Sequence, residues 1–192
     1  MARPSMTPFS FTLISLVALA ALTFAAAAEG THQSICGVVI NARFIEGAPT
    51  DRFEIENASA NGWSISSATF DLSQTPAGLV FDTEDGGGGL EVFQPFKAAE
   101  SSAKLGGISG LTDGGTTLIL NFTSFAPGET FAFTIDIDDS LENSARRQTQ
   151  VVGSEIEGVS LRASAARADG RSIVVEGVFA TDASVNASTS EC

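Results

Sequence analysis

Hydrophobic and polar residues alternate most clearly between Phe131 and Asp138. Every second position is a large hydrophobic residue, in the order Phe131, Phe133, Ile135 and Ile137. A period of two over eight residues predicts a β-strand with one buried face, because successive side chains of a strand point to opposite sides. The other side ends in Asp136 and Asp138, and Asp139 follows directly. The pattern therefore predicts a core strand that ends in three carboxylates.

Shorter runs of the same kind recur along the chain and predict further strands. They cover residues 35–45, 52–56, 63–65, 68–72, 79–81, 90–96, 116–122, 159–163 and 173–179, with turn residues between them. Residues 98–115 are small and polar and are expected to form a long connection, with one helical turn at most. The last ten residues are expected to fray unless Cys192 holds them. Nine or ten short strands without an amphipathic helix predict an all-β protein, folded as an antiparallel β-sandwich.

The first 28 residues have the parts of a secretory signal peptide. Arg3 is their one charged residue, and an apolar run rich in Leu and Ala ends in small residues directly before Glu29. An uncharged stretch of this length could also anchor the chain in a bilayer, but the small-residue ending favours cleavage. We therefore expect residues 1–28 to be a cleaved signal peptide and residues 29–192 to form one domain. That domain would be secreted, periplasmic or at the cell surface.

The chain is strongly acidic, with 23 Asp and Glu against 10 Lys and Arg and a net charge of −13. This balance argues against nucleic-acid binding, which depends on neutralising phosphates, and favours divalent cations, basic partners or simply solubility. Only Cys36 and Cys192 are present. In an oxidising compartment we expect them to form a disulfide, with a free Cys192 that links two chains as the alternative.

Two groups of carboxylates could supply the oxygen ligands that Ca²⁺ requires. The first is Asp136, Asp138 and Asp139, and the second is Asp82, Glu84 and Asp85 on a glycine-rich loop. Neither group fits the helix–loop–helix calcium consensus, and carboxylates at strand ends also serve solubility and edge protection. Because Asp136 and Asp138 share one face, their repulsion must be relieved by solvent, by an arginine such as Arg52 or Arg146, or by a cation.

No residue pattern in the chain indicates a reaction. His32, the single histidine, lies in the polar segment just after the expected cleavage point, where it cannot easily serve as an oriented base. The Gly86–Gly89 run lacks the lysine of a phosphate-binding loop. An Asp/Glu pair could serve a glycosidase, but sugar sites use exposed aromatic rings, and the chain has one Trp and no Tyr. We expect a protein that is not an enzyme.

Five segments together resemble the small exported bacterial proteins known as aggregation factor core proteins, named after a sponge cell-adhesion proteoglycan. The segments are Phe44–Asn57, Gly78–Gly89, Glu91–Phe96, Ala126–Asp139 and Val151–Gly158. The resemblance implies an extracellular β-sandwich for adhesion or matrix assembly that depends on calcium. Its partner would be an extracellular or cell-surface protein, a polysaccharide or a second copy. A secreted carbohydrate-binding module or glycosidase, and a purely structural envelope protein, are the alternatives.

Overall fold

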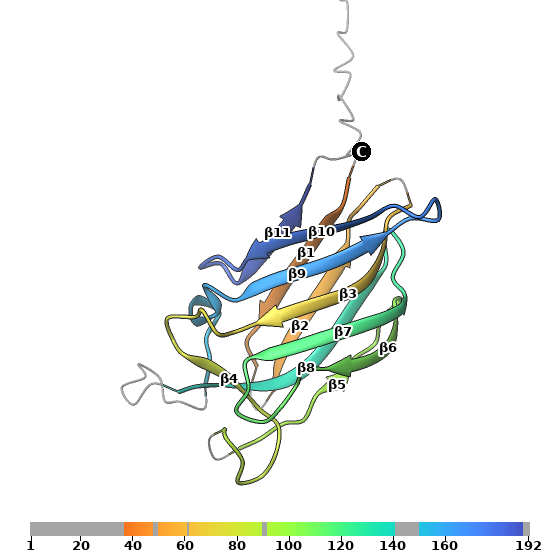
Figure 1. The fold of residues 1–192 in the computed structure, drawn as a ribbon. Coiled ribbons are helices and arrows are strands. Elements are labelled where there is room, and N and C mark those ends of the chain that lie inside the picture. The colour runs from red at the N-terminus through yellow and green to blue at the C-terminus, as the bar shows by residue number, and fades with distance from the viewer. Residues whose placement is uncertain (1–36, 48–49, 61, 90–91, 141–149, 190–192) are drawn as a thin grey trace, which may run out of the picture. The chain divides into compact units, whose positions relative to one another are not determined.

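The computed structural model describes residues 37–47, 50–60, 62–89, 92–140 and 150–189, which form two antiparallel sheets (Figure 1). One sheet has the order β11 (Ser184–Ser188), β1 (Val39–Ile45), β2 (Asp51–Asn57), β8 (Thr130–Asp139) and β4 (Leu79–Asp82), and β5 (Lys97–Ala98) also pairs with β8. The other has the order β10 (Ser172–Val178), β9 (Ser160–Ala166), β3 (Ser64–Asp71), β7 (Thr117–Ser124) and β6 (Lys104–Ser109). A short 3₁₀ helix, η1, spans Gly153–Ile156. The predicted all-β antiparallel sandwich is confirmed.

Two expectations about individual segments are wrong. Residues 92–96 are not a strand, and only the two-residue β5 follows them. The expected connection 98–115 contains β6, which pairs with β7 through two register shifts around its glycines, so its side chains do not alternate regularly. The expectation for the last ten residues depends on Cys192, which lies outside the described residues; within those ten, Ser184–Ser188 form β11, which pairs with β1 from Val39 to Arg43. Neither β6 nor β11 has a long run of apolar residues. Both lie at the edge of a sheet, where backbone hydrogen bonds to one neighbouring strand hold them.

Phenylalanines from both sheets form the centre of the core. Phe133 of β8 stacks on Phe53 of β2, with ring centroids 5.1 Å apart, and meets Phe70 of β3 edge-on at 5.6 Å. Phe179, just after β10, also contacts Phe53 and Phe70. All four rings are at most 1% exposed. The prediction that Phe133 and Ile135 are core residues of a central strand is confirmed, since neither is exposed to solvent.

A buried asparagine joins the two layers at one end of β2. Asn57 is fully buried, and its Nδ2 donates to the carbonyl oxygens of Trp63 at 2.9 Å and Phe125 at 2.8 Å. Its Oδ1 accepts a hydrogen bond from the Ser59 amide at 3.1 Å. One side chain therefore satisfies three backbone groups that water does not reach.

Replacing Asn57 with Ala should lower the free energy of unfolding by about 2–4 kcal/mol, because three buried backbone groups each lose a hydrogen bond and only the Phe125 carbonyl keeps a second one, from the Ile65 amide. Chemical denaturation of the variant measures this loss. The matched control is Asn121→Ala, which removes an exposed amide bonded to the Ser109 hydroxyl and should change stability by less than about 0.5 kcal/mol. Equal losses for the two variants would show that the Asn57 bonds do not stabilise the fold.

Several predictions concern residues outside the described ranges. These are the signal peptide 1–28, His32, Arg146 and the disulfide between Cys36 and Cys192. Each stays a prediction. Among the described residues, no helix has the length and hydropathy needed to cross a bilayer.

Candidate functional site

The pairing of β4 with β8 brings two predicted carboxylate groups together. Asp82, the last residue of β4, lies opposite Asp136 in the antiparallel register, and Val80 lies opposite Asp138. Because Phe133, Ile135 and Ile137 point into the core, the alternation of β8 places Asp136 and Asp138 on the other face of the sheet. Asp82 joins them from the neighbouring strand. Carboxylates more than fifty residues apart in sequence thus share one place in the fold.

These three aspartates, Asp82, Asp136 and Asp138, form what we call the aspartate cluster. One carboxylate oxygen from each lies within 4.8 Å of those of the other two. Their side chains are buried, with exposed fractions of 2%, 5% and 0%. Solvent, the ordinary means of relieving repulsion at a strand end, is therefore largely excluded from the cluster. Arg52, one of the two arginines considered for this role, donates instead to Glu54, with Nε 2.9 Å from Oε1.

The pKa of Asp136 shows the electrostatic cost of this arrangement. Burial raises the pKa from 3.8 to about 7, and repulsion from Asp138 and Asp82 adds to the effect. The backbone N–H of Ile137 lowers the pKa by a smaller amount. The cluster therefore favours a bound proton or another positive charge near neutral pH.

A fourth aspartate, which the sequence did not single out, interacts electrostatically with the cluster without belonging to its set of close carboxylates. Asp51 is the first residue of β2, pairs in register with Ile135 and is 4% exposed. Burial raises its pKa to about 8, with further increases from Asp136, Glu46 and Asp138, while the Gly47 amide donates a hydrogen bond that opposes them. Asp51 continues the inward-facing row of Phe53 and Ile55 in β2, a place where the alternation alone leads one to expect an apolar residue.

The acidic loop after β4 is organised by another unpredicted carboxylate, Asp113. Its Oδ1 accepts hydrogen bonds from the amides of Thr83 at 2.6 Å and Glu84 at 2.9 Å. Its Oδ2 accepts from the amides of Gly88 and Gly89. Burial alone would raise the pKa of Asp113, but these four backbone donors outweigh it and hold the pKa below its usual range. Asp113 therefore fixes the loop as a closed turn.

The glycine run lets this loop approach the aspartate cluster closely. A Cβ at Gly89 would lie 2.1 Å from Cγ of Asp82, so any larger residue would displace that carboxylate. Glu84 and Asp85 are exposed, and together with Asp82, Gly89 and Phe93 they line a small pocket of about 150 Å³. Glu84 and Asp85, the other predicted ligands of the second group, thus lie beside Asp82 but do not belong to the aspartate cluster.

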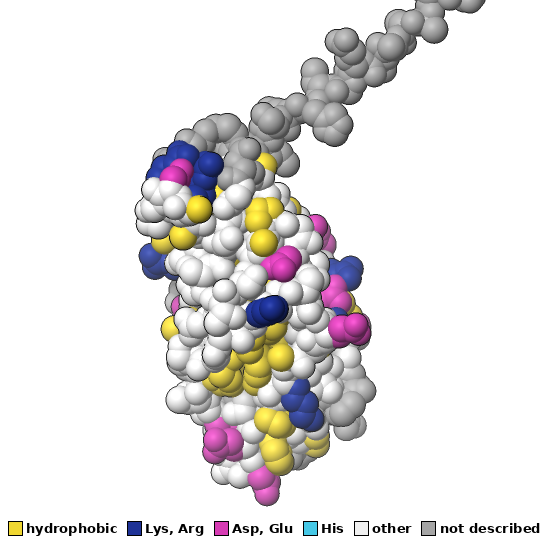
Figure 2. All heavy atoms as spheres, turned by 90° about the vertical axis from the view of Figure 1, so that its right-hand side faces the viewer, with side chains coloured by type: hydrophobic (Ala, Val, Ile, Leu, Met, Phe, Trp, Pro, Cys, Tyr) yellow, Lys and Arg dark blue, Asp and Glu magenta, His cyan; other side chains and the backbone are white. Residues whose placement is uncertain are grey.

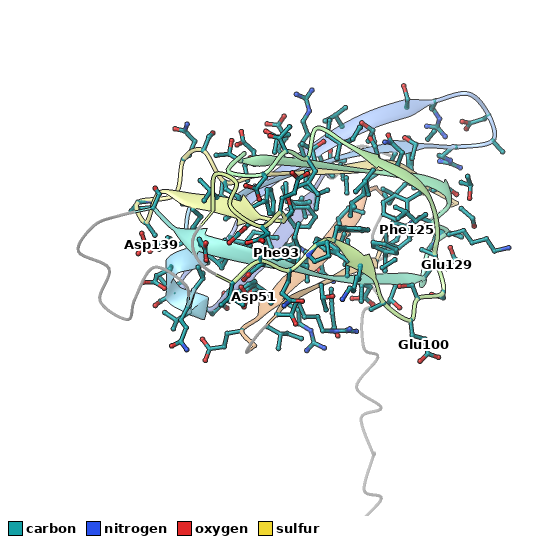
Figure 3. All side chains as sticks on the ribbon, turned by 90° about the horizontal axis from the view of Figure 1, so that it is seen from below. Asp51, Phe93, Glu100, Phe125, Glu129 and Asp139 are labelled. Carbon is teal, nitrogen blue, oxygen red and sulfur yellow. The ribbon has the colours of Figure 1, made fainter. Side chains whose placement is uncertain are left out.

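Asp139 is the one member of the first group that lies apart. It is 2% exposed but pairs in register with Leu79, which belongs to the inward-facing row of β4. Figure 3 shows it at the end of β8, away from Asp51 and Phe93. Among the described residues, the set of close carboxylates contains Asp82, Asp136 and Asp138 and not Asp139.

The donor set of the cluster fits a hard cation. All three side chains offer oxygen, the atom type that Ca²⁺ and Mg²⁺ prefer, and neither nitrogen nor sulfur is among them. Calcium takes six to eight oxygens at 2.3–2.6 Å and tolerates irregular geometry, so carboxylates, backbone carbonyls and water can complete the shell. A divalent ion would also offset the repulsion that raises the pKa of Asp136.

Comparisons with known proteins add no family or relative to these observations. No family model matches the chain, and neither a curated protein nor a solved structure is significantly similar to it.

Proposed function

We propose that the protein is an exported, non-catalytic adhesion or extracellular-matrix module that binds Ca²⁺ at the aspartate cluster. The observation that carries this proposal is the meeting of three buried carboxylates within 4.8 Å. Burial of like charges is costly unless a proton or a cation accompanies them, and the exterior of cells contains millimolar-range calcium that suits weak sites. The sequence resemblance to aggregation factor core proteins supports the adhesive role.

The surface charge supports a partner other than nucleic acid. On the face drawn in Figure 2, Lys and Arg side chains lie singly or beside Asp and Glu, not in a continuous basic strip. The partner we propose is an extracellular protein, a polysaccharide or a second copy of the chain. Bound calcium would fix the strand end and the acidic loop, and so hold the adhesive surface in one conformation.

Millimolar Ca²⁺ should raise the melting temperature by about 5–10 °C, because a ligand that binds only the native state stabilises it by mass action. The double variant Asp136→Asn with Asp138→Asn should lose this rise. Differential scanning calorimetry with CaCl₂ and with EDTA measures both. The control pair is Glu157→Gln with Glu176→Gln, two exposed acids that lie outside the cluster and whose loss should leave the rise unchanged.

Two results would contradict the calcium proposal. One is a wild-type melting temperature that does not respond to calcium, and the other is an equal response in the Asp136/Asp138 double variant. The adhesive role has its own test. Beads coated with the protein should aggregate in CaCl₂ and disperse in EDTA, and beads that stay dispersed in both would contradict adhesion between copies.

A further inference from the structure

The outer face of the six-stranded sheet carries a groove that is separate from the aspartate cluster. It has a volume of about 580 Å³ and lies over β11, β1, β2 and the first part of β8. This volume falls within the range of small-molecule sites in proteins. None of the three aspartates of the cluster lines it.

Strand register arranges the groove as two parallel rows of polar side chains. One row runs Ser184, Arg43, Glu54, Ala132, and the next runs Asn186, Asn41, Glu56, Thr130. Neighbouring strands are about 4.8 Å apart, so the first row presents polar groups at regular intervals across three strands and the second across four. The small side chains of Ala132 and Thr130 leave room at the β8 end. Glu100, which Figure 3 shows pointing away from the sandwich, borders that end.

Hydrogen bonds within the rows hold these side chains in place. Asn186 Nδ2 donates to Asn41 Oδ1 at 2.8 Å, and Asn41 Nδ2 donates to Glu56 Oε2 at 3.1 Å. Each amide still has a second N–H and a second lone pair for a ligand. In the other row, Arg43 Nε donates to Glu54 Oε2 at 2.7 Å. Groups that are already ordered lose little entropy when a ligand binds.

The charges of the groove disfavour an anionic ligand. Arg43 and Arg52 both bind Glu54, and these hydrogen bonds, that of Arg52 first, hold the pKa of Glu54 below its usual range. Two arginines face three glutamates in the lining, Glu54, Glu56 and Glu100, so the groove is acidic by one charge, and the whole chain carries −13. Phosphate groups and acidic polymers would meet net repulsion here.

The groove also lacks the anchors of a protein interface. Of the described residues that line it, Phe131 alone is aromatic, and Phe131 is 2% exposed and faces the core. Buried aromatic anchors dominate most protein–protein contacts. A peptide could not extend the sheet here either, because the backbone groups of β1, β2 and β8 beneath the groove are paired with neighbouring strands. Recognition must therefore use the exposed amides, carboxylates and hydroxyls.

We infer that the groove binds a neutral oligosaccharide segment of an extracellular polysaccharide through the paired rows of β11, β1, β2 and β8. Sugar hydroxyls both donate and accept, so one ring can use the free N–H groups of Asn41 and Asn186 and the free oxygens of Glu56. The absence of a stacking ring among the lining residues implies weak single-site binding, which many copies on a surface would strengthen. This inference rests on the proposed adhesive function, whose partner it names, but it does not depend on calcium binding.

Native gels cast with dextran, mannan or galactomannan, and run in EDTA, test the inference. At least one of these neutral polysaccharides should retard the protein, and Asn41→Ala or Glu56→Ala should weaken that retardation about tenfold in apparent dissociation constant. The matched controls Asn121→Ala and Glu176→Ala remove exposed side chains of β7 and β10 in the other sheet and should leave it unchanged. Circular dichroism of each variant establishes that it is folded.

Three results would overturn the inference. They are no retardation by any of the three polysaccharides, retardation that survives both groove variants, and retardation by the acidic polymer alginate alone. Sedimentation of the free protein provides a further test. Self-association that disappears with Asn41→Ala would assign the groove to a second copy and not to a saccharide. Because the gels contain EDTA, a failure of the calcium proposal does not affect these outcomes.

Discussion

Phe133→Ala should lower the free energy of unfolding by about 3–5 kcal/mol, the largest loss that we expect from a single core substitution. The ring is fully buried and has its centroid within 5.6 Å of the rings of Phe53, Phe70 and Phe96, so its removal leaves a cavity between the two sheets. Each lost aromatic pair adds to the cost of lost burial. Urea denaturation monitored by circular dichroism measures the change.

Two further variants make this result specific. Phe133→Leu keeps most of the apolar volume and should lower the free energy of unfolding clearly less than Phe133→Ala. The leucine variant also keeps the prediction testable if the alanine variant does not fold. Phe93→Ala removes a ring that is 38% exposed beside the acidic loop and should cost much less. If Phe133→Ala and Phe93→Ala had equal effects, the stacked phenylalanines would not be the centre of the core.

The second large effect is a fall in stability as the pH rises from about 4 to 8. In the folded protein the pKa of Asp51 is raised from 3.8 to about 8 and that of Asp136 to about 7. Between 3.8 and these values the native state binds more protons than the unfolded chain, so the free energy of unfolding decreases with increasing pH. The two groups repel each other and share the effect, and we expect a total on the order of 5 kcal/mol.

Denaturation in urea at several pH values, with EDTA present, measures this slope. Asp51→Asn should flatten it and should make the protein more stable than wild type at pH 8, because the amide has no charge to bury. Glu157→Gln, an exposed acid elsewhere on the surface, should keep the wild-type slope. A wild-type stability that is constant or increases over this range would contradict the raised pKa values.

Calcium and pH should act on the same carboxylates. A cation at Asp82, Asp136 and Asp138 stabilises their charged forms, so CaCl₂ should recover stability at pH 8 more than at pH 5. Equal recovery at both values would place the calcium elsewhere on the protein. This comparison separates ion binding at the cluster from a general effect of salt.

The alternation of side chains was enough to predict the central strand and its two faces. Phe131, Phe133, Ile135 and Ile137 mark β8 by themselves, since the period of a strand is a local property of the backbone. The same pattern placed Asp136 and Asp138 together on the opposite face. The all-β class follows similarly, because short alternating runs between turn residues recur along the chain.

Strands without such a pattern depend on their neighbours. The β6 sequence contains Gly106 and Gly107, and β11 has only Val185 and Ala187 as buried residues. Their backbones form hydrogen bonds to β7 and β1. Backbone pairing of this kind leaves no periodic pattern in the side chains of the strand. Tertiary structure alone decided that these segments are strands.

The aspartate cluster, too, could be predicted only in part from the sequence. The sequence identified acids at the end of β8 and on the loop after β4, but it placed them at an exposed strand end and gave Asp139 the same role as its neighbours. Register set Asp82 opposite Asp136, paired Asp51 with Ile135 and left Asp139 in the inward-facing row. Burial, which raises the pKa values, also depends on which segments cover a strand. Sequence determines which face a side chain takes, because that is local, whereas distances between strands come from non-local backbone pairing that only the folded chain establishes.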